Sequence, residues 1–486
     1  MPENLSTIKR KSLTGFIWRM GEGVIAQGMT FIVGMFLARL LEPEEFGIVA
    51  LSGIFLSIIG VFANCGLGQA LIQKKDADSL DTNSVFFAGL GIAGFLYLFV
   101  FLGAPLVAQM FHQPAITNLM RVSSLTLFLS SYNSVQIAEV SRALDFKKFF
   151  FVGIISSFVS GFVGLSMAFY GFGVWALVSQ SIAYSIAKTI VMSRIIGWTP
   201  KLQFSWGRLK PLLSYGLNLM IAGVIGMIFH QMRGFLIGLK YKPTDLSFYS
   251  RGESMPNILC NNINGTIEQI MLPALSKVQD TSELVKVGLR HSIMLSSFVL
   301  MPMMFGLAAT AENIIPILFS EKWMPSVPFL QVIAIGYCFS ILSSTNLMAI
   351  NAIGRSDITL KLEYIKKPSY LVLLLLAILW GPLAIAAATA IYSIIAMSIN
   401  AWPNKKLINY SLREQWEDLW PQFVLSLVMG IIVWLVGRLD LNIYILFFIQ
   451  MVLGVVLYLG LSKLLHLEGY KYALKTWKDL RRGNND

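Results

Sequence analysis

Long apolar segments follow one another along almost the whole chain, from about Gly15 to Leu461. Most are close to the roughly 20 residues that a helix needs to cross a bilayer. We therefore predict an all-α polytopic membrane protein with about 14 transmembrane helices. The expected spans are 14–38, 46–68, 84–104, 118–139, 150–169, 174–194, 212–238, 245–268, 288–310, 327–350, 368–380, 382–402, 421–437 and 441–461.

The segment 245–273 differs from the others because polar residues recur in it at spacings of three and four. On a helix this rhythm places them on a single stripe. Lipid would leave such groups unsatisfied at considerable cost, so the stripe must face other helices or water. A dry interface between helices and a hydrophilic cavity both fit, and we pursue the cavity. The stripe consists of Ser247, Ser250, Ser254, Asn257, Asn261, Asn264 and Glu268.

The composition excludes a soluble chain, since 56% of the residues are hydrophobic, 13% are charged and the mean hydropathy is +0.67. The net charge of +12 lies in short loops between apolar segments, which is typical of topology signals and does not indicate a nucleic-acid partner. The three cysteines and four histidines show no spacing of metal ligands, and no phosphate-binding loop is present.

The loop charges also predict the orientation. With the N-terminus inside, inner segments carry 28 of the 38 lysines and arginines and outer loops carry 5. This bias predicts that both termini are cytoplasmic.

The chain repeats itself, because residues 36–47 resemble residues 235–246 with one residue inserted. Two weaker matches follow in the same order, so we predict a duplicated unit of six helices. The expected parts are an N-terminal lobe (1–200), a C-terminal lobe (201–402) and a last part (403–486) with two extra helices and a basic tail. Two parallel lobes with a polar seam are typical of an alternating-access transporter.

Charged residues lie inside several expected spans, where each costs roughly 2.5–3.5 kcal/mol at a helix centre. They are candidates to line water or to bind an anion. The residues concerned are Arg19, Glu22, Arg121, Lys188, Arg233 and Arg251.

Simpler roles remain open for these charges. Arg121, Lys188 and Arg233 could reach a membrane surface. Arg19 and Glu22 are one helical turn apart and could form an internal ion pair, and Arg251 lies near the outer end of its span.

Six segments together resemble the Wzx-type polysaccharide flippases, in particular the colanic-acid-exporter-like branch of the multidrug/oligosaccharidyl-lipid/polysaccharide exporter superfamily. The segments are 248–258, 261–265, 272–280, 319–323, 328–331 and 142–148.

The resemblance implies a transporter, not an enzyme, in the bacterial inner membrane. Its cargo would be an undecaprenyl-diphosphate-linked oligosaccharide, moved from the inner to the outer leaflet. The in-span cations would offset the diphosphate charge, and the stripe would bind sugar hydroxyls. No cofactor or metal is implied, and the polysaccharide polymerase and chain-length machinery are candidate partners.

Two alternatives stay open. One is an exporter of another cargo from the same superfamily, such as lipid II or a drug. The other is a membrane polysaccharide polymerase or ligase, which the short outer loops disfavour because they are poor in acid–base pairs.

Overall fold

The computed structural model describes residues 5–143, 145–472 and 474, and the side chains among them except those of 5–17, 19, 20 and 270. The described part is helical throughout its ordered elements, which confirms the predicted fold class. The helices are α1 (Leu5–Leu40), α2 (Pro43–Asn64), α3 (Leu67–Gln73), α4 (Ser79–Met110), α5 (Ala115–Ser123), α6 (Thr126–Ala143), α7 (Lys147–Phe169), α8 (Val174–Ile196), α9 (Trp206–Lys240), α10 (Pro243–Ser276), α11 (Ser282–Ala309), α12 (Ala311–Phe319), the 3₁₀ helix η1 (Glu321–Ser326), α13 (Val327–Ala352), α14 (Ser356–Ala377), α15 (Pro382–Ala401), α16 (Asn404–Ile408), α17 (Leu412–Val436) and α18 (Ile443–Leu464).

Fourteen of the described helices have at least 18 residues, and each overlaps one expected span. Eleven stretches among the described residues are long and apolar enough to cross a membrane. The long helices that fall short are α6, α10 and α14, because polar or charged residues interrupt their apolar faces.

Several helix boundaries differ from the expected spans. The expected span 118–139 is divided into α5 and α6 by a turn at Ser124 and Leu125. The expected outer loop 311–326 is helical, and α14 begins twelve residues before the expected span 368–380.

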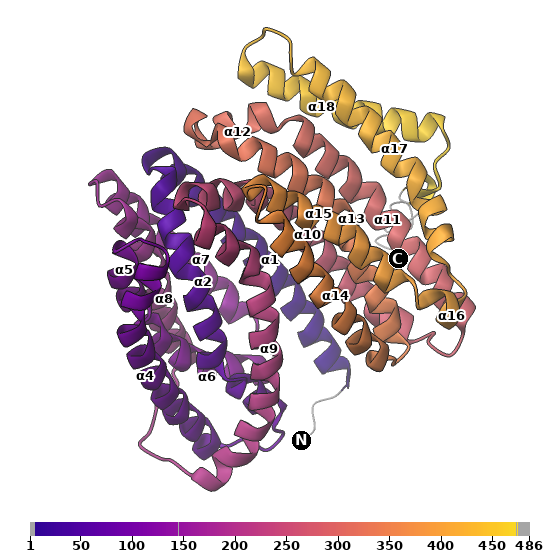
Figure 1. Cartoon of the computed structure of the whole chain (residues 1–486). Helices are drawn as coiled ribbons and strands as arrows, with labels where there is room; N and C mark the ends of the chain where they lie inside the picture. The colour runs from indigo at the N-terminus through magenta and orange to yellow at the C-terminus, as the bar shows by residue number, and fades with distance from the viewer. Residues whose placement is uncertain (1–4, 144, 473, 475–486) are drawn as a thin grey trace. The chain divides into compact units, whose positions relative to one another are not determined.

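The chain forms two compact units, Met1–Ser247 and Phe248–Asp486. In Figure 1 the first unit runs from indigo to magenta and the second from magenta through orange to yellow. Within the first unit, α9 packs against α2 and α3. The lobes themselves rest on the duplication and stay a prediction.

The same turn begins α2 and α10. Each helix starts with a proline, at 43 and 243, whose fixed φ suits a first helical position. At the start of α2, the backbone N–H of Glu42 donates to the Glu45 carboxylate at 2.8 Å. At the start of α10, the backbone N–H of Lys242 donates to the Asp245 carboxylate at 3.0 Å. This shared cap supports the duplication read from the sequence.

A second pair of turns also corresponds. Gly173 precedes α8 with a φ of 55°, and Gly381 precedes α15 with a φ of 114°. Residues with a side chain rarely adopt these angles, so each hairpin depends on its glycine.

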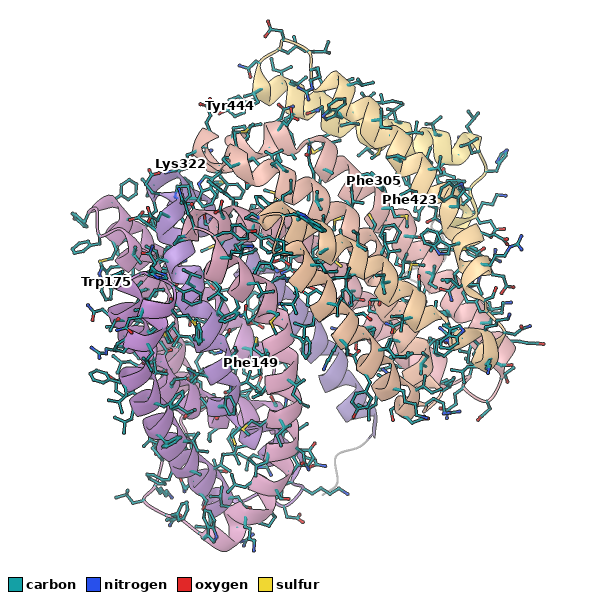
Figure 2. All side chains as sticks on the ribbon, in the orientation of Figure 1. Phe149, Trp175, Phe305, Lys322, Phe423 and Tyr444 are labelled. Atoms are coloured by element: carbon teal, nitrogen blue, oxygen red, sulfur yellow. The ribbon has the colours of Figure 1, made fainter. Side chains whose placement is uncertain are left out.

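Within the second unit, the two last long helices, α17 and α18, pack against each other and α17 packs against α11, with the pair shown in yellow tones in Figure 1. Phe423 of α17 meets Phe305 of α11 edge to face, with ring centroids 5.4 Å apart (Figure 2). At one end of α11, the guanidinium of Arg290 donates two hydrogen bonds to Asp418, at 2.8 and 2.6 Å. Both contacts fix α17 to α11.

Candidate functional site

The polar stripe of α10 lies partly against α13, within the second unit. The hydroxyl of Tyr337 lies 3.1 Å from a Glu253 carboxylate oxygen and 3.3 Å from the Asn257 side-chain oxygen. Two helical turns further on, the hydroxyl of Ser344 donates to the Asn264 side-chain oxygen at 2.7 Å. The stripe is therefore bound along one edge by α13.

The other edge of the stripe is open. Asn261 and Glu268 are exposed, whereas Asn257 and Asn264 are half-buried. The Asn261 amide nitrogen donates to the Asn257 side-chain oxygen at 2.7 Å. The stripe thus makes a helix contact on one edge and leaves exposed polar side chains on the other, and the hydrophilic cavity stays a prediction.

Ser254 takes a local role in the structure. Its hydroxyl donates to the backbone carbonyl of Arg251 at 2.7 Å, one turn earlier in α10. Such a bond uses the hydroxyl proton within its own helix and leaves the oxygen as an acceptor, so the role of Ser254 toward a ligand stays a prediction.

Arg251 lies between two aromatic rings at the start of the second unit. Its guanidinium carbon is 4.6 Å from the centroid of the Phe319 ring and 4.7 Å from that of Trp323. Both rings are fully buried, so the attraction between cation and ring is little screened. This contact supports the structural reading of Arg251, and its role toward an anion stays a prediction.

The contact of Arg251 with Phe319 and Trp323 joins two of the segments that carried the family resemblance, 248–258 and 319–323. At Gly252, a Cβ atom would lie 2.7 Å from Phe329 Cβ, 2.8 Å from Leu330 N and 3.0 Å from the carbonyl oxygen of Ser326. Only glycine allows α10 to approach α13 so closely. Glycine here sets the distance across which Tyr337 reaches the stripe.

In the first unit, Glu22 and Lys188 share a cavity of about 80 Å³. This volume is enough for several water molecules. A Cβ atom at Gly153 would lie 2.9 Å from Glu22 Cγ, so this glycine leaves the space that the carboxylate occupies. The cavity is lined by Glu22, Ile137, Phe149 (Figure 2), Val152, Gly153, Tyr184 and Lys188.

Among the predicted cations whose side chains the structure describes, Arg121 and Arg233 do not line this cavity. Arg121 lies on α5, where its Nε donates to the carbonyl oxygen of Phe101 at 3.1 Å and its guanidinium lies 4.1 Å from that ring's centroid. Arg233 lies half-buried on α9. Arg19 belongs to α1, but its side chain lies outside the described part, so its pairing with Glu22 stays a prediction.

Sequence reasoning missed the residues that hold the stripe and the cavity. Tyr337 and Tyr184 lie in mostly apolar spans, and Ser344 lies in a short polar run, Ser343 to Asn346, without the extended spacing of three and four that marked the stripe. Lys366 was counted with a loop, yet it lies buried on α14 with its Nζ 2.5 Å from Glu363.

The helical fold and its long apolar helices define a multi-pass membrane protein. The chain is similar to a lipid II flippase MurJ in an inward closed conformation, with a TM-score of 0.72 and 18% identity over 91% of this chain and 98% of that one. It is also similar to an inward-facing multidrug resistance MATE family transporter of the MOP superfamily, with a TM-score of 0.61 and 14% identity over 80% and 98% of the two chains. At these identities the likeness shows the fold.

Residues 36–328 match the polysaccharide biosynthesis protein family, and because this is more than half of the chain, the protein belongs to that family. It is 25% identical to the succinoglycan biosynthesis transport protein ExoT of Rhizobium meliloti (strain 1021), over 72% of each chain. It is 21% identical to the lipopolysaccharide biosynthesis protein WzxC of Escherichia coli (strain K12), over 89% of this chain and 88% of the relative. The resemblance to Wzx-type flippases is confirmed.

Proposed function

We propose that this protein moves an undecaprenyl-diphosphate-linked oligosaccharide from the inner to the outer leaflet of the bacterial inner membrane, by alternating access and with both termini cytoplasmic. The family match over residues 36–328 carries the proposal, because it extends through α10 and its polar stripe. An accessible polar surface on a long helix is what a glycan needs on its way through a membrane.

In this proposal the two chemical parts of the cargo meet different groups. The diphosphate is attracted by the in-span cations, Arg19, Arg121, Lys188, Arg233 and Arg251, through charge-assisted hydrogen bonds. The sugars meet the amides of the α10 stripe. Lys188 is the cation best placed to exchange the Glu22 carboxylate for a phosphate, since both side chains line a cavity large enough for water.

The cargo distinguishes this proposal from its nearest alternatives. Solved structures of the same fold are titled as a lipid II flippase and as multidrug transporters. The matched family and the named relatives instead concern polysaccharides, which favours an oligosaccharide cargo. We further propose that the protein is a transporter without enzymatic activity, and that it hands its cargo to the polysaccharide polymerase and chain-length machinery.

Deletion of the gene in the parent strain tests the proposal. We expect loss of one surface polysaccharide and accumulation of its lipid-linked repeat unit on the cytoplasmic leaflet, which mass spectrometry of extracted lipids identifies. Complementation with the wild type should restore export, and Arg233→Ala should not. Arg413→Ala is the matched control, because Arg413 is 89% exposed and pairs with Glu417.

Normal surface polysaccharide in the deletion strain, with no accumulated lipid-linked sugar, would contradict the proposed cargo. Full export by Arg233→Ala would remove that residue from the anion path.

A further inference from the structure

The contacts between α10 and α13 form a regular ladder. Tyr337 contacts Asn257, and Ser344 contacts Asn264, each pair 80 residues apart in the chain. Two contacts separated by seven residues on both helices require that the helices run in the same direction and in register. The ladder therefore fixes the rotation of α10 about its own axis as well as its position.

The first contact has a chemical asymmetry. A tyrosine hydroxyl has one proton, whereas two oxygens lie within reach of Tyr337, on Glu253 and Asn257. The Asn257 oxygen also accepts the amide N–H of Asn261 at 2.7 Å. Through this oxygen, Tyr337 and Asn261 are linked.

The hydrogen bond to Asn257 sets the orientation of the Asn261 side-chain amide. One of its amide N–H groups is used by Asn257, and within the described part of the chain this is its single side-chain hydrogen bond. Its carbonyl oxygen and second N–H are left for a ligand on the exposed edge of the stripe. An acceptor and a donor side by side on a planar group match two neighbouring hydroxyls of a sugar ring.

We propose that Asn261 is a sugar-binding residue and that Tyr337 and Ser344 are positioning residues that hold it in the orientation for binding. This inference rests on the proposed function. It divides the stripe into an edge that contacts α13 and an exposed edge that binds sugar. Preorganised side chains bind more tightly because less conformational freedom is lost on binding.

Binding of two probes to the purified full-length protein tests the inference. The probes are undecaprenyl diphosphate and the glycosylated undecaprenyl diphosphate extracted from the deletion strain. The measured quantity is the dissociation constant of the bare lipid divided by that of the glycosylated lipid. A merely structural defect weakens both probes together, whereas loss of a sugar contact changes the ratio.

We expect Asn261→Ala to weaken binding of the glycosylated probe by about 3- to 10-fold, the range for one or two neutral hydrogen bonds, and to leave the bare lipid unchanged. Tyr337→Phe and Ser344→Ala should each reduce the ratio by about 2- to 5-fold. Ser344→Thr, which keeps the hydroxyl, should keep the wild-type ratio.

Two control variants accompany these. Asn262→Ala changes the neighbouring exposed amide, which donates to the Ile258 carbonyl within its own helix at 2.9 Å. Tyr392→Phe removes a hydroxyl from a half-buried tyrosine on α15. Neither should change the ratio.

The outcomes separate this inference from the proposed function. A wild-type protein that binds neither probe overturns both. A wild type that binds both equally, or variants at 261, 337 and 344 that keep the wild-type ratio, overturn the inference while the flippase proposal stands.

Discussion

Replacement of Gly252 by alanine should separate α10 from α13 and disorder the stripe. The added Cβ would lie 2.7 Å from Phe329 Cβ, and ordinary contact begins near 3.4 Å, so the helices must part by about 0.7 Å at this point. If Tyr337 stays in place, its distances of 3.1 and 3.3 Å lengthen to about 3.8 and 4.0 Å. Both are too long for a hydrogen bond.

The expected cost follows from these two effects. Overpacking against a backbone costs about 1–3 kcal/mol, and a lost hydrogen bond adds about 1 kcal/mol. For a unit of this size, each kcal/mol lowers the melting temperature by roughly 2–4 °C. We therefore expect thermal unfolding of the purified variant in detergent about 4–16 °C below that of a control alanine variant that meets no clash.

Gly265→Ala is the matched control on the same helix. A Cβ at Gly265 meets nothing within 4 Å. Alanine is favoured over glycine in a helix by about 0.5–1 kcal/mol, and this gain applies to both variants, so their difference measures the clash. Equal melting temperatures for the two variants would refute the close approach of α10 to α13.

Two further predictions concern other elements. Gly47→Ala should destabilise the first unit by about 1–3 kcal/mol, because its Cβ would overlap the carbonyl oxygen of Pro243, whereas Gly53→Ala meets nothing within 4 Å and should be neutral or stabilising; thermal unfolding of both variants checks this, and equal stability would contradict it. At the start of α4, the backbone N–H of Asp81 holds the pKa of the Asp78 carboxyl below its ordinary value of 3.8. The stabilisation that this cap gives is present above pH 3.8 and is lost as the pH falls through the depressed folded-state pKa of Asp78. Over that pH range, hydrogen exchange in the first turn of α4, corrected for intrinsic rates, should become faster in the wild type. It should not do so in Asp78→Ser, because serine caps the helix without titrating in this range.

Much of the fold could be predicted because a bilayer imposes a simple rule on sequence. A spanning helix must be apolar over about 20 residues, so apolar segments mark the helices directly. The rule fails where a helix extends beyond the apolar part. Lys366 and Lys367 placed the start of the expected span after them, at 368, yet α14 begins before both lysines. Lys366 is neutralised by Glu363, and a helical backbone needs no apolar side chains outside the lipid.

The candidate site was predictable on one side only. Spacing along α10 revealed the stripe, because its residues share one helix and therefore one periodicity. Tyr337 and Ser344 come from another helix, and no periodicity connects residues 80 positions apart. Similarly, the sequence showed that Glu22 and Lys188 are charged, but the packing of α1 against α7, and of α7 against α8, brings them to one cavity.

We propose above that this protein carries a lipid-linked oligosaccharide across a bilayer. The most direct measurement uses proteoliposomes with glycosylated undecaprenyl diphosphate in both leaflets and a glycosidase that does not cross the membrane. Without the protein, about half of the glycan should be protected in the inner leaflet. With the wild-type protein we predict that the enzyme digests well beyond half, and a fraction that remains at half would contradict the account.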